Sequence, residues 1–316
     1  MSILLDFFSL LLVIFGGYLA LGILRYLSNW SQRRTVQFAI LAMPLMMLSV
    51  DMCMLSASSW KSLPAMILAL AMGAVALSAF VLGIVRLMLM AQIVTYRGLP
   101  ASPEFQMLVH DLARQFNAKK PRVLFYEYNR PLALTCGIFQ PTILLSSWMV
   151  EHLDQYELEA VLAHELEHVA RRDYLVIWLA TMLRDAFFYV PTSWVAYRQL
   201  QQEKELACDD MAIGATRRPL ALASALAKVW LHAAEGPRFP QFSIAQPLVG
   251  VSESINGRIE RLLDPPEPTK STLHRQRGTS SVSIPAVGLL ILEAANGILL
   301  LALMGCGPTL PLGKLF

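Results

Sequence analysis

Two histidines and a glutamate lie at a spacing that can bind a metal ion and activate a water molecule. The segment HELEH runs from His164 to His168, in a stretch whose apolar residues recur at helical spacing. Residues four apart share a helix face, so both imidazoles can reach one ion. Glu165 projects beside that ion, where a carboxylate can accept a proton from water. The pattern predicts zinc-assisted hydrolysis of a peptide bond.

A third protein ligand is needed, because a catalytic zinc ion takes three such ligands and keeps its fourth position for water. Glu205 lies on a second expected helix, in the segment EKELACDD. We favour it over Glu203, which falls on a different face of that helix. Asp209 shares a face with Glu205 and can orient one of the ligating histidines. We interpret Cys208 as a small buried residue rather than a redox-sensitive thiol.

The composition places these motifs in a membrane protein. Of the 316 residues, 55% are hydrophobic and 16% are charged, which is too apolar for an ordinary soluble domain. The net charge of +3 is small and its basic residues lie in short loops. This argues against nucleic acid as a direct partner and favours contact with membrane lipids. The four cysteines show no CxxC spacing, so we expect free thiols.

Four apolar runs are long enough to cross a membrane, since a spanning helix needs about 20 residues. Arg25, Arg33 and Arg34 follow the first run, whereas Lys61 alone lies between the second and the third. Basic loops stay inside, so we expect the first loop and residues 98–283 in the cytoplasm of a multi-pass inner-membrane protein. The runs are Ile3–Leu24, Val36–Ala57, Leu63–Val85, which continues to Val94, and Ile284–Met304.

Between the third and fourth runs the pattern changes to that of a folded domain with a small sheet. Arg122–Tyr128 and Thr142–Ser146 are rich in β-branched and aromatic residues, which predicts two short strands. Asp154 and Glu157 form a capping box at the start of the helix that carries HELEH. Further helices are expected at Val195–Ala215, Leu220–Ala234 and Ile255–Leu263.

The segment Tyr174–Val190 is almost apolar enough to be a fifth span. Arg184 and Asp185 interrupt it and Pro191 ends it. Charged residues are costly inside a bilayer, so we interpret the segment as a buried or membrane-surface helix.

These elements define a fold class and four parts of the chain. We expect an α-helical membrane protein with four transmembrane helices and an α+β, zincin-like catalytic domain with a small sheet. Residues 1–97 form a three-span transmembrane region and residues 98–265 the cytoplasmic zinc metallopeptidase domain. Residues 266–283 form a linker, and residues 284–316 the fourth transmembrane helix with a short tail.

Several pieces of sequence together resemble one family. They are GIFQPTILLS, HELEHVARRDYL, FFYVPTSW, EKELACDD and RIERLL, in this order between residues 137 and 263. The set is similar to the antirepressor membrane metallopeptidases of the BlaR/MecR type, a gluzincin-like group that forms peptidase family fifty-six. The resemblance implies zinc ligands at His164, His168 and Glu205. It further implies a general base at Glu165 and a supporting role for Asp209.

The resemblance also implies a substrate and partners. Members of the family cut a protein in the cytoplasm, often a transcriptional repressor or the peptidase itself. The substrate would pair as an added strand with an exposed sheet edge. We expect that edge to be formed by Thr142, Ile143, Leu144, Leu145 and Ser146. Only about a dozen residues follow Met304, too few for a penicillin-binding domain, so a separate sensor protein is a possible partner.

Two alternatives stay open. A quality-control peptidase of the HtpX type shares the zinc motifs but cuts damaged membrane proteins. A non-catalytic signal transducer would use zinc only as a structural ion, although Glu165 has no purpose in such a site. His232 is a candidate for oxyanion stabilisation, but we favour a packing role for it. We also favour helix packing over signalling for Asp51, Glu293 and Asn296, which lie within expected spans.

Overall fold

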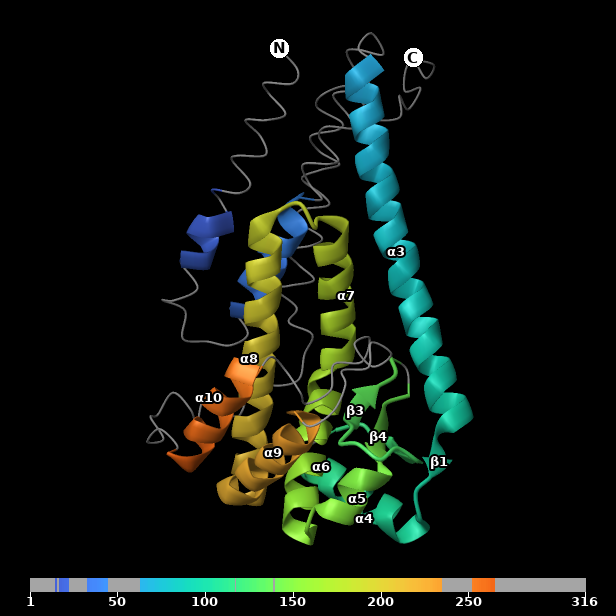
Figure 1. Ribbon diagram of the computed structural model, residues 1–316, viewed down its shortest axis with the longest axis vertical. Coiled ribbons are helices and arrows are strands. Elements are labelled where there is room, and N and C mark those ends of the chain that lie inside the picture. The colour runs from blue at the N-terminus through green and yellow to red at the C-terminus, as the bar shows by residue number, and fades with distance from the viewer. Residues whose placement is uncertain are drawn as a thin grey trace, which may run out of the picture. The chain divides into compact units, whose positions relative to one another are not determined.

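The computed structural model describes residues 15, 17–22, 33–44, 63–116, 118–138, 140–234 and 252–264 (Figure 1). Within these ranges the protein is mostly helical and contains one small mixed sheet of four strands. The expected span Ile284–Met304 and linker 266–283 lie outside the described residues, as do Asp51, Glu293 and Asn296. The first two expected spans are described only in part, as helix at residues 17–22 and 33–44.

The chain forms two compact units. The first comprises Met1–Gly83, Leu179–Leu200 and Ser281–Phe316, and the second comprises Ile84–Trp178 and Gln201–Ser280. Helix α3, Leu63–Arg97, covers both the third expected span and its continuation. Within α3, Gly73–Gln92 is long and apolar enough to cross a membrane, and no other helix in the described ranges meets that test. The four-span topology and the four-part division of the chain therefore stay predictions.

In the first unit, the end of α7 and the start of α8 form a helical hairpin. Helix α7 is Asp173–Ala186 and α8 is Pro191–Thr216. At 14 residues α7 is shorter than a spanning helix, which agrees with its interpretation as a buried or membrane-surface helix. Arg184 pairs with Asp185 and its guanidinium lies 4.4 Å from the ring centre of Tyr197. Arg184 and Asp185, the two charged residues that interrupt the apolar segment, therefore neutralise each other.

The sheet belongs to the second unit and its strand order is β1-β2-β4-β3. Strands β2 and β4 are parallel, whereas β1 pairs antiparallel with β2, and β3 pairs antiparallel with β4. The strand expected at Arg122–Tyr128 ends two residues earlier than predicted. The bounds are β1 Leu99–Pro100, β2 Arg122–Tyr126, β3 Ala133–Cys136 and β4 Thr142–Ser146.

The expectation that Thr142–Ser146 forms a substrate-binding edge is wrong. This strand, β4, is hydrogen-bonded on both sides, to β2 and to β3, and all five of its residues are buried. A continuous apolar strand is typical of a sheet interior, because both of its faces are covered. Among the described strands, the one at the edge of the sheet next to β4 is β3, which has only four residues and was not predicted from the sequence.

Helix α6, Gln155–Arg171, is fixed in the second unit by its cap and by its core face. The predicted capping box is confirmed: Asp154 accepts hydrogen bonds from the first turn, and Glu157 accepts one from the Asp154 backbone. Leu162 and Leu166 are fully buried in a core shared with the sheet and α9. The other helices of the unit are α4 Pro103–Gln115, α5 Ser147–His152, α9 Pro219–Ala234 and α10 Ser252–Leu263.

Candidate metal centre

The two histidines of α6 point their rings into the same small volume. His164 is completely buried and His168 is 9% exposed. Their ring centres are 4.8 Å apart and the ring planes are nearly perpendicular. This is the arrangement expected from residues one helical turn apart.

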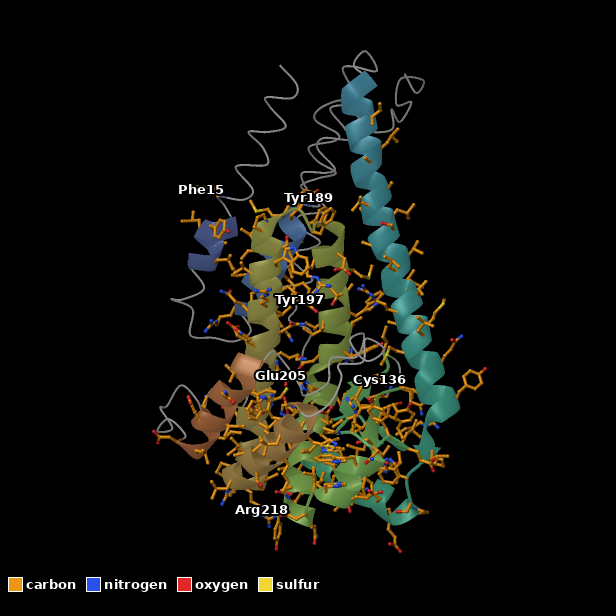
Figure 2. The ribbon with its side chains drawn as sticks, in the orientation of Figure 1. Phe15, Cys136, Tyr189, Tyr197, Glu205 and Arg218 are labelled. Carbon is orange, nitrogen blue, oxygen red and sulfur yellow. The ribbon has the colours of Figure 1, made fainter. Side chains whose placement is uncertain are left out.

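Helix α8 brings Glu205 to these histidines, as the sequence predicted; Figure 2 labels Glu205 on α8. Glu205 Oε2 lies 3.4 Å from His164 Nε2, and Oε1 lies 3.9 Å from His168 Nε2. In the described residues, these three side chains form one of two groups whose ligand atoms lie within 4.8 Å of one another. Glu203 belongs to neither group.

The geometry and chemistry of these three residues fit a zinc ion. With bonds of about 2.1 Å, two donor atoms of a tetrahedral zinc site lie about 3.4 Å apart. The distances of 3.4 and 3.9 Å between Glu205 and the histidines are close to this value. His164 Nε2 is buried and makes no hydrogen bond, which is costly unless another partner binds it.

His164 is supported by Asp209, one turn after Glu205 on α8. Asp209 Oδ1 lies 3.0 Å from His164 Nδ1, on the side of the ring away from Glu205. Burial alone would lower the pKa of His164, but the carboxylates of Asp209 and Glu205 raise it to about 9. The protein around His164 therefore favours a positive charge at this place, and a divalent cation would supply one.

His168 is supported by Asp173, at the first turn of α7. Asp173 Oδ2 lies 2.9 Å from His168 Nδ1, within hydrogen-bond distance. Burial alone would raise the pKa of Asp173, but Arg171 and His168 lower it to about 2. Between the two helices, Arg172 takes the left-handed conformation with φ 54°, which ends α6 and returns the chain towards His168.

Cys208 lies beside the second histidine. Its Sγ is 3.2 Å from His168 Nδ1 and the residue is fully buried, which agrees with the interpretation of Cys208 as a small buried residue. Together His168, Asp173 and Cys208 form the second group of clustered ligand atoms. Arg171 lies 3.4 Å from Asp173, and this positive charge disfavours a second cation there.

The described cysteines are unsuited to act as nucleophiles. Burial raises the pKa of Cys136 to about 12 and that of Cys208 well above its usual value. Both side chains are free thiols in the structure. Since the thiolate is the reactive form, cysteine catalysis is disfavoured at both positions.

Two cations hold the carboxylate of Glu205. Lys204 Nζ lies 2.9 Å from Glu205 Oε1, and Arg258 Nη1 lies 3.2 Å from Oε2. Burial alone would raise the pKa of Glu205, but Lys204, His164 and Arg258 keep it well below its usual value. Glu205 is therefore held in its ionised form, which is the form that could bind a metal ion.

Glu165 faces strand β3. The hydroxyl of Thr135 donates a hydrogen bond of 2.7 Å to Glu165 Oε2, and Glu165 is 3% exposed. Thr135 lies on β3, so one side chain of the strand at the edge of the described sheet contacts the expected general base. The sequence offered no signal for this contact, because Thr135 lies 30 residues before Glu165.

Comparison with known proteins places this site in a family. The sequence matches the family described as BlaR1 peptidase M56 over residues 29–262, more than half of the chain. The protein belongs to the BlaR1 peptidase M56 family. The expected family is thereby confirmed, and the matched region contains every residue of the metal centre described above.

Curated relatives carry a second protease name. The chain is 32% identical over 162 residues to protease HtpX homolog 1 of Streptomyces coelicolor, covering 40% of this chain and 53% of that protein. It is 33% identical over 91 residues to the protease HtpX homolog of Aquifex aeolicus, covering 28% and 30% respectively. With protease HtpX homolog 2 of Methanosarcina mazei it shares 26% over 162 residues, covering 40% and 55%. The chain thus spans about half the length, or less, of these relatives.

Within this BlaR1 peptidase M56 family member, four residues that support the site were given no role from the sequence: Thr135, Asp173, Lys204 and Arg258. Asp173 and Arg258 were present in the family-like pieces HELEHVARRDYL and RIERLL, but neither received a role. An acidic residue five positions after the second histidine was the available signal for Asp173. For Thr135 and Arg258 no local pattern pointed to the metal centre.

His232 does not join the centre. Its ring lies 4.8 Å from that of Trp148 and is tilted by 30°. It is absent from both ligand groups in the described residues. The packing role favoured from sequence agrees with this position.

Proposed function

We propose that the protein is a membrane-anchored, zinc-dependent endopeptidase. The observation that carries the proposal is the convergence of His164, His168 and Glu205, with Glu165 on the same helix. Membership of a peptidase family and relatives named protease support the same reaction class. The membrane anchor is supported by α3, which contains the apolar segment Gly73–Gln92.

The residues of the site would divide the work as follows. His164, His168 and Glu205 would hold zinc, which when bound supplies a Lewis acid for water and for the peptide carbonyl. Glu165 would accept the proton of the attacking water and pass it to the leaving nitrogen. Thr135 donates its hydrogen bond to Oε2 of Glu165, so the other carboxylate oxygen, Oε1, would accept the proton from water. Asp209 and Asp173 would keep the two imidazoles in the orientation that presents Nε2 to the metal.

The sheet supports a polypeptide as the substrate. Strand β3 pairs with β4 alone among the described strands, so its other edge can accept an extended peptide by strand addition. The same strand carries Thr135, which touches Glu165. A peptide paired with β3 would therefore lie beside the general base.

For the identity of the substrate we propose a cytoplasmic or membrane-proximal protein, with a transcriptional repressor or the peptidase itself as first candidates. The support is the resemblance to BlaR/MecR-type enzymes and the distribution of basic residues, which favours a multi-pass protein with the catalytic domain in the cytoplasm. A separate sensor protein and membrane lipids complete the proposed partners.

A second candidate is quality control of membrane proteins, as expected for a peptidase of the HtpX type. It is favoured by the relatives, which carry the name protease HtpX homolog. Both candidates use the same metal centre and the same reaction. They differ only in which protein is cut.

The test compares cells that express the full chain as wild type, Glu165→Gln or Glu159→Gln. Glu159 lies on the same helix but pairs with Arg218 on the protein surface, so it is a matched control. New protein N-termini are identified by chemical labelling and mass spectrometry, and zinc content is measured on the purified proteins. Removal of a general base costs about 10²- to 10⁴-fold in rate.

The proposal predicts one set of cleavages present with wild type and Glu159→Gln and lost with Glu165→Gln, while all three proteins hold about one zinc. If Glu165→Gln binds zinc and leaves every cleavage unchanged, the site is structural and the non-catalytic alternative holds. Cleaved DNA-binding proteins would favour the repressor candidate, and cleaved multi-span proteins would favour quality control.

A further inference from the structure

Arg258 connects α10 to the metal centre through two carboxylates at once. Its Nε and Nη2 donate hydrogen bonds of 2.7 Å each to Asp209 Oδ2 and Oδ1. Its third nitrogen, Nη1, lies 3.2 Å from Glu205 Oε2. All three nitrogens of one guanidinium thus face the ligand Glu205 and the residue that supports His164. The side chain is 3% exposed, so these contacts are shielded from water.

The three contacts of Arg258 set the orientation of the carboxylates as well as neutralising their charge. A planar guanidinium that binds a carboxylate in a fork sets the direction of that carboxylate, which a single point charge does not. Asp209 is held by the fork on one side and lies 3.0 Å from His164 Nδ1 on the other. Rotation of the Asp209 carboxylate would therefore break the contacts with both Arg258 and His164.

Stability by itself is a poor explanation for this cluster. A buried ion pair gives little net stabilisation, because the loss of solvation offsets most of the attraction. If this cluster served only to pack α10 on its neighbours, apolar residues would do so without the cost of burying charge. The charged residues are Asp209, Glu205 and Arg258. Their arrangement is explained when the two carboxylates must be held in fixed positions for a ligand.

Helix α10 carries a second arginine that offers a comparison. Arg261, one turn after Arg258, donates a hydrogen bond of 2.8 Å to Asp210 Oδ2. Asp210 is adjacent to Asp209 on α8 but belongs to neither ligand group. Arg261 therefore joins the same two helices without contacting the metal centre. Figure 1 shows α10 beside α9, the helix against which it packs.

We propose that Arg258 is a positioning residue for metal binding: docking of α10 places its guanidinium on Asp209 and Glu205 and so completes the zinc site. The inference rests on the proposed function, since it takes the ion to be bound by His164, His168 and Glu205. It adds that zinc affinity depends on a helix outside both the HELEH and EKELACDD segments.

The test measures zinc affinity of the purified full chain in detergent, by competition with a chromophoric chelator. The variants are Arg258→Gln, Arg258→Lys and, as the matched control, Arg261→Gln. We expect Arg258→Gln to bind zinc about 10- to 100-fold more weakly, the usual effect of losing a residue that supports a metal ligand. Arg258→Lys retains the charge without the fork and should be intermediate. Arg261→Gln should stay within about threefold of wild type, since it contributes to the α8–α10 contact alone.

A purely structural role would give a different result. Both glutamine variants would then lower the thermal midpoint of the metal-free protein similarly and leave zinc affinity unchanged. Wild-type affinity in Arg258→Gln would overturn the inference. If Arg258→Gln does not fold, Arg258→Lys provides the test. Wild-type zinc affinity in Arg258→Lys would also overturn the inference. Failure of the wild type itself to bind zinc would instead reject the proposed function.

Discussion

The two histidines of α6 lie one turn apart on the same helix, yet different parts of the chain support them. His168 is held by Asp173, five residues later, across a single left-handed turn. His164 is held by Asp209 on α8, which is held in turn by Arg258 a further 49 residues along the chain. One support is local and the other is tertiary.

This difference separates two requirements of the same metal centre. The contact between His168 and Asp173 needs only the left-handed cap at Arg172 and an acidic residue at the start of α7. The His164 side needs α8 and α10 to be docked in the correct register. A defect in tertiary packing should therefore weaken the His164 side first, while the His168 side persists.

The largest effect is expected at the residue that the two sides share. Glu205→Gln removes the negative charge of the proposed metal ligand, while the shape of the side chain is retained. Zinc affinity should fall by more than the roughly 10- to 100-fold that follows the loss of a supporting residue. Equilibrium dialysis against zinc would measure this, with Glu203→Gln as the control, since Glu203 belongs to neither ligand group. Equal losses in both variants would show that Glu205 is not a ligand.

The next effect compares the two supports directly. Asp173→Asn and Asp209→Asn should each weaken zinc binding about 10- to 100-fold. The effect of Arg258→Gln should be smaller when Asp209 is already asparagine, because the fork has lost its charged partner and only the contact with Glu205 remains. In an Asp173→Asn background, the effect of Arg258→Gln should instead persist. Titration of the three single and two double variants with zinc would measure this, and equal coupling to both aspartates would contradict the division into two sides.

A smaller effect is expected at the turn of the local side. Arg172 has φ 54°, a conformation that costs a β-branched residue the most. Arg172→Val should destabilise the protein by about 1–2 kcal/mol and weaken zinc binding by displacing Asp173. Arg172→Gly accepts the same φ and is the control. Thermal unfolding with and without zinc would measure both effects; a valine variant equal to the glycine variant would show that the turn is unstrained.

The smallest effect lies at the far end of α6, remote from both supports. Burial alone would raise the pKa of Glu157, but hydrogen bonds from Lys228, Ser224 and the Asp154 backbone lower it. A lowered pKa contributes stability above the unfolded value near pH 4.5, and this contribution is lost as the pH falls through the folded value. Glu157→Gln should cost about 1 kcal/mol at pH 7, typical of a helix cap, and the deficit should shrink towards pH 4. Thermal midpoints at the two pH values would show this; a constant deficit would contradict it.

Local patterns predicted much of the fold. The capping box at Asp154 set the start of α6, because its two hydrogen bonds involve residues only three apart. The buried strand Thr142–Ser146 was found with its observed bounds, since a run of apolar residues between turn signals needs no knowledge of neighbours. Its place in the sheet was predicted wrongly, because strand order depends on which other segments pair with it. The short strand β3, which occupies the edge, is too brief to produce a pattern.

By itself, the sequence determined the chemistry of the centre: two histidines at helical spacing, a glutamate between them and a second acidic helix segment far downstream. These follow from residue type and from the period of a helix, which are local properties. Only the tertiary structure decided which residues support that chemistry, namely Thr135 at Glu165 and Arg258 at Asp209. These contacts join residues that are 30 and 49 positions apart in the sequence. Whether such residues meet depends on how the helices and strands pack, and no short segment of sequence encodes that packing.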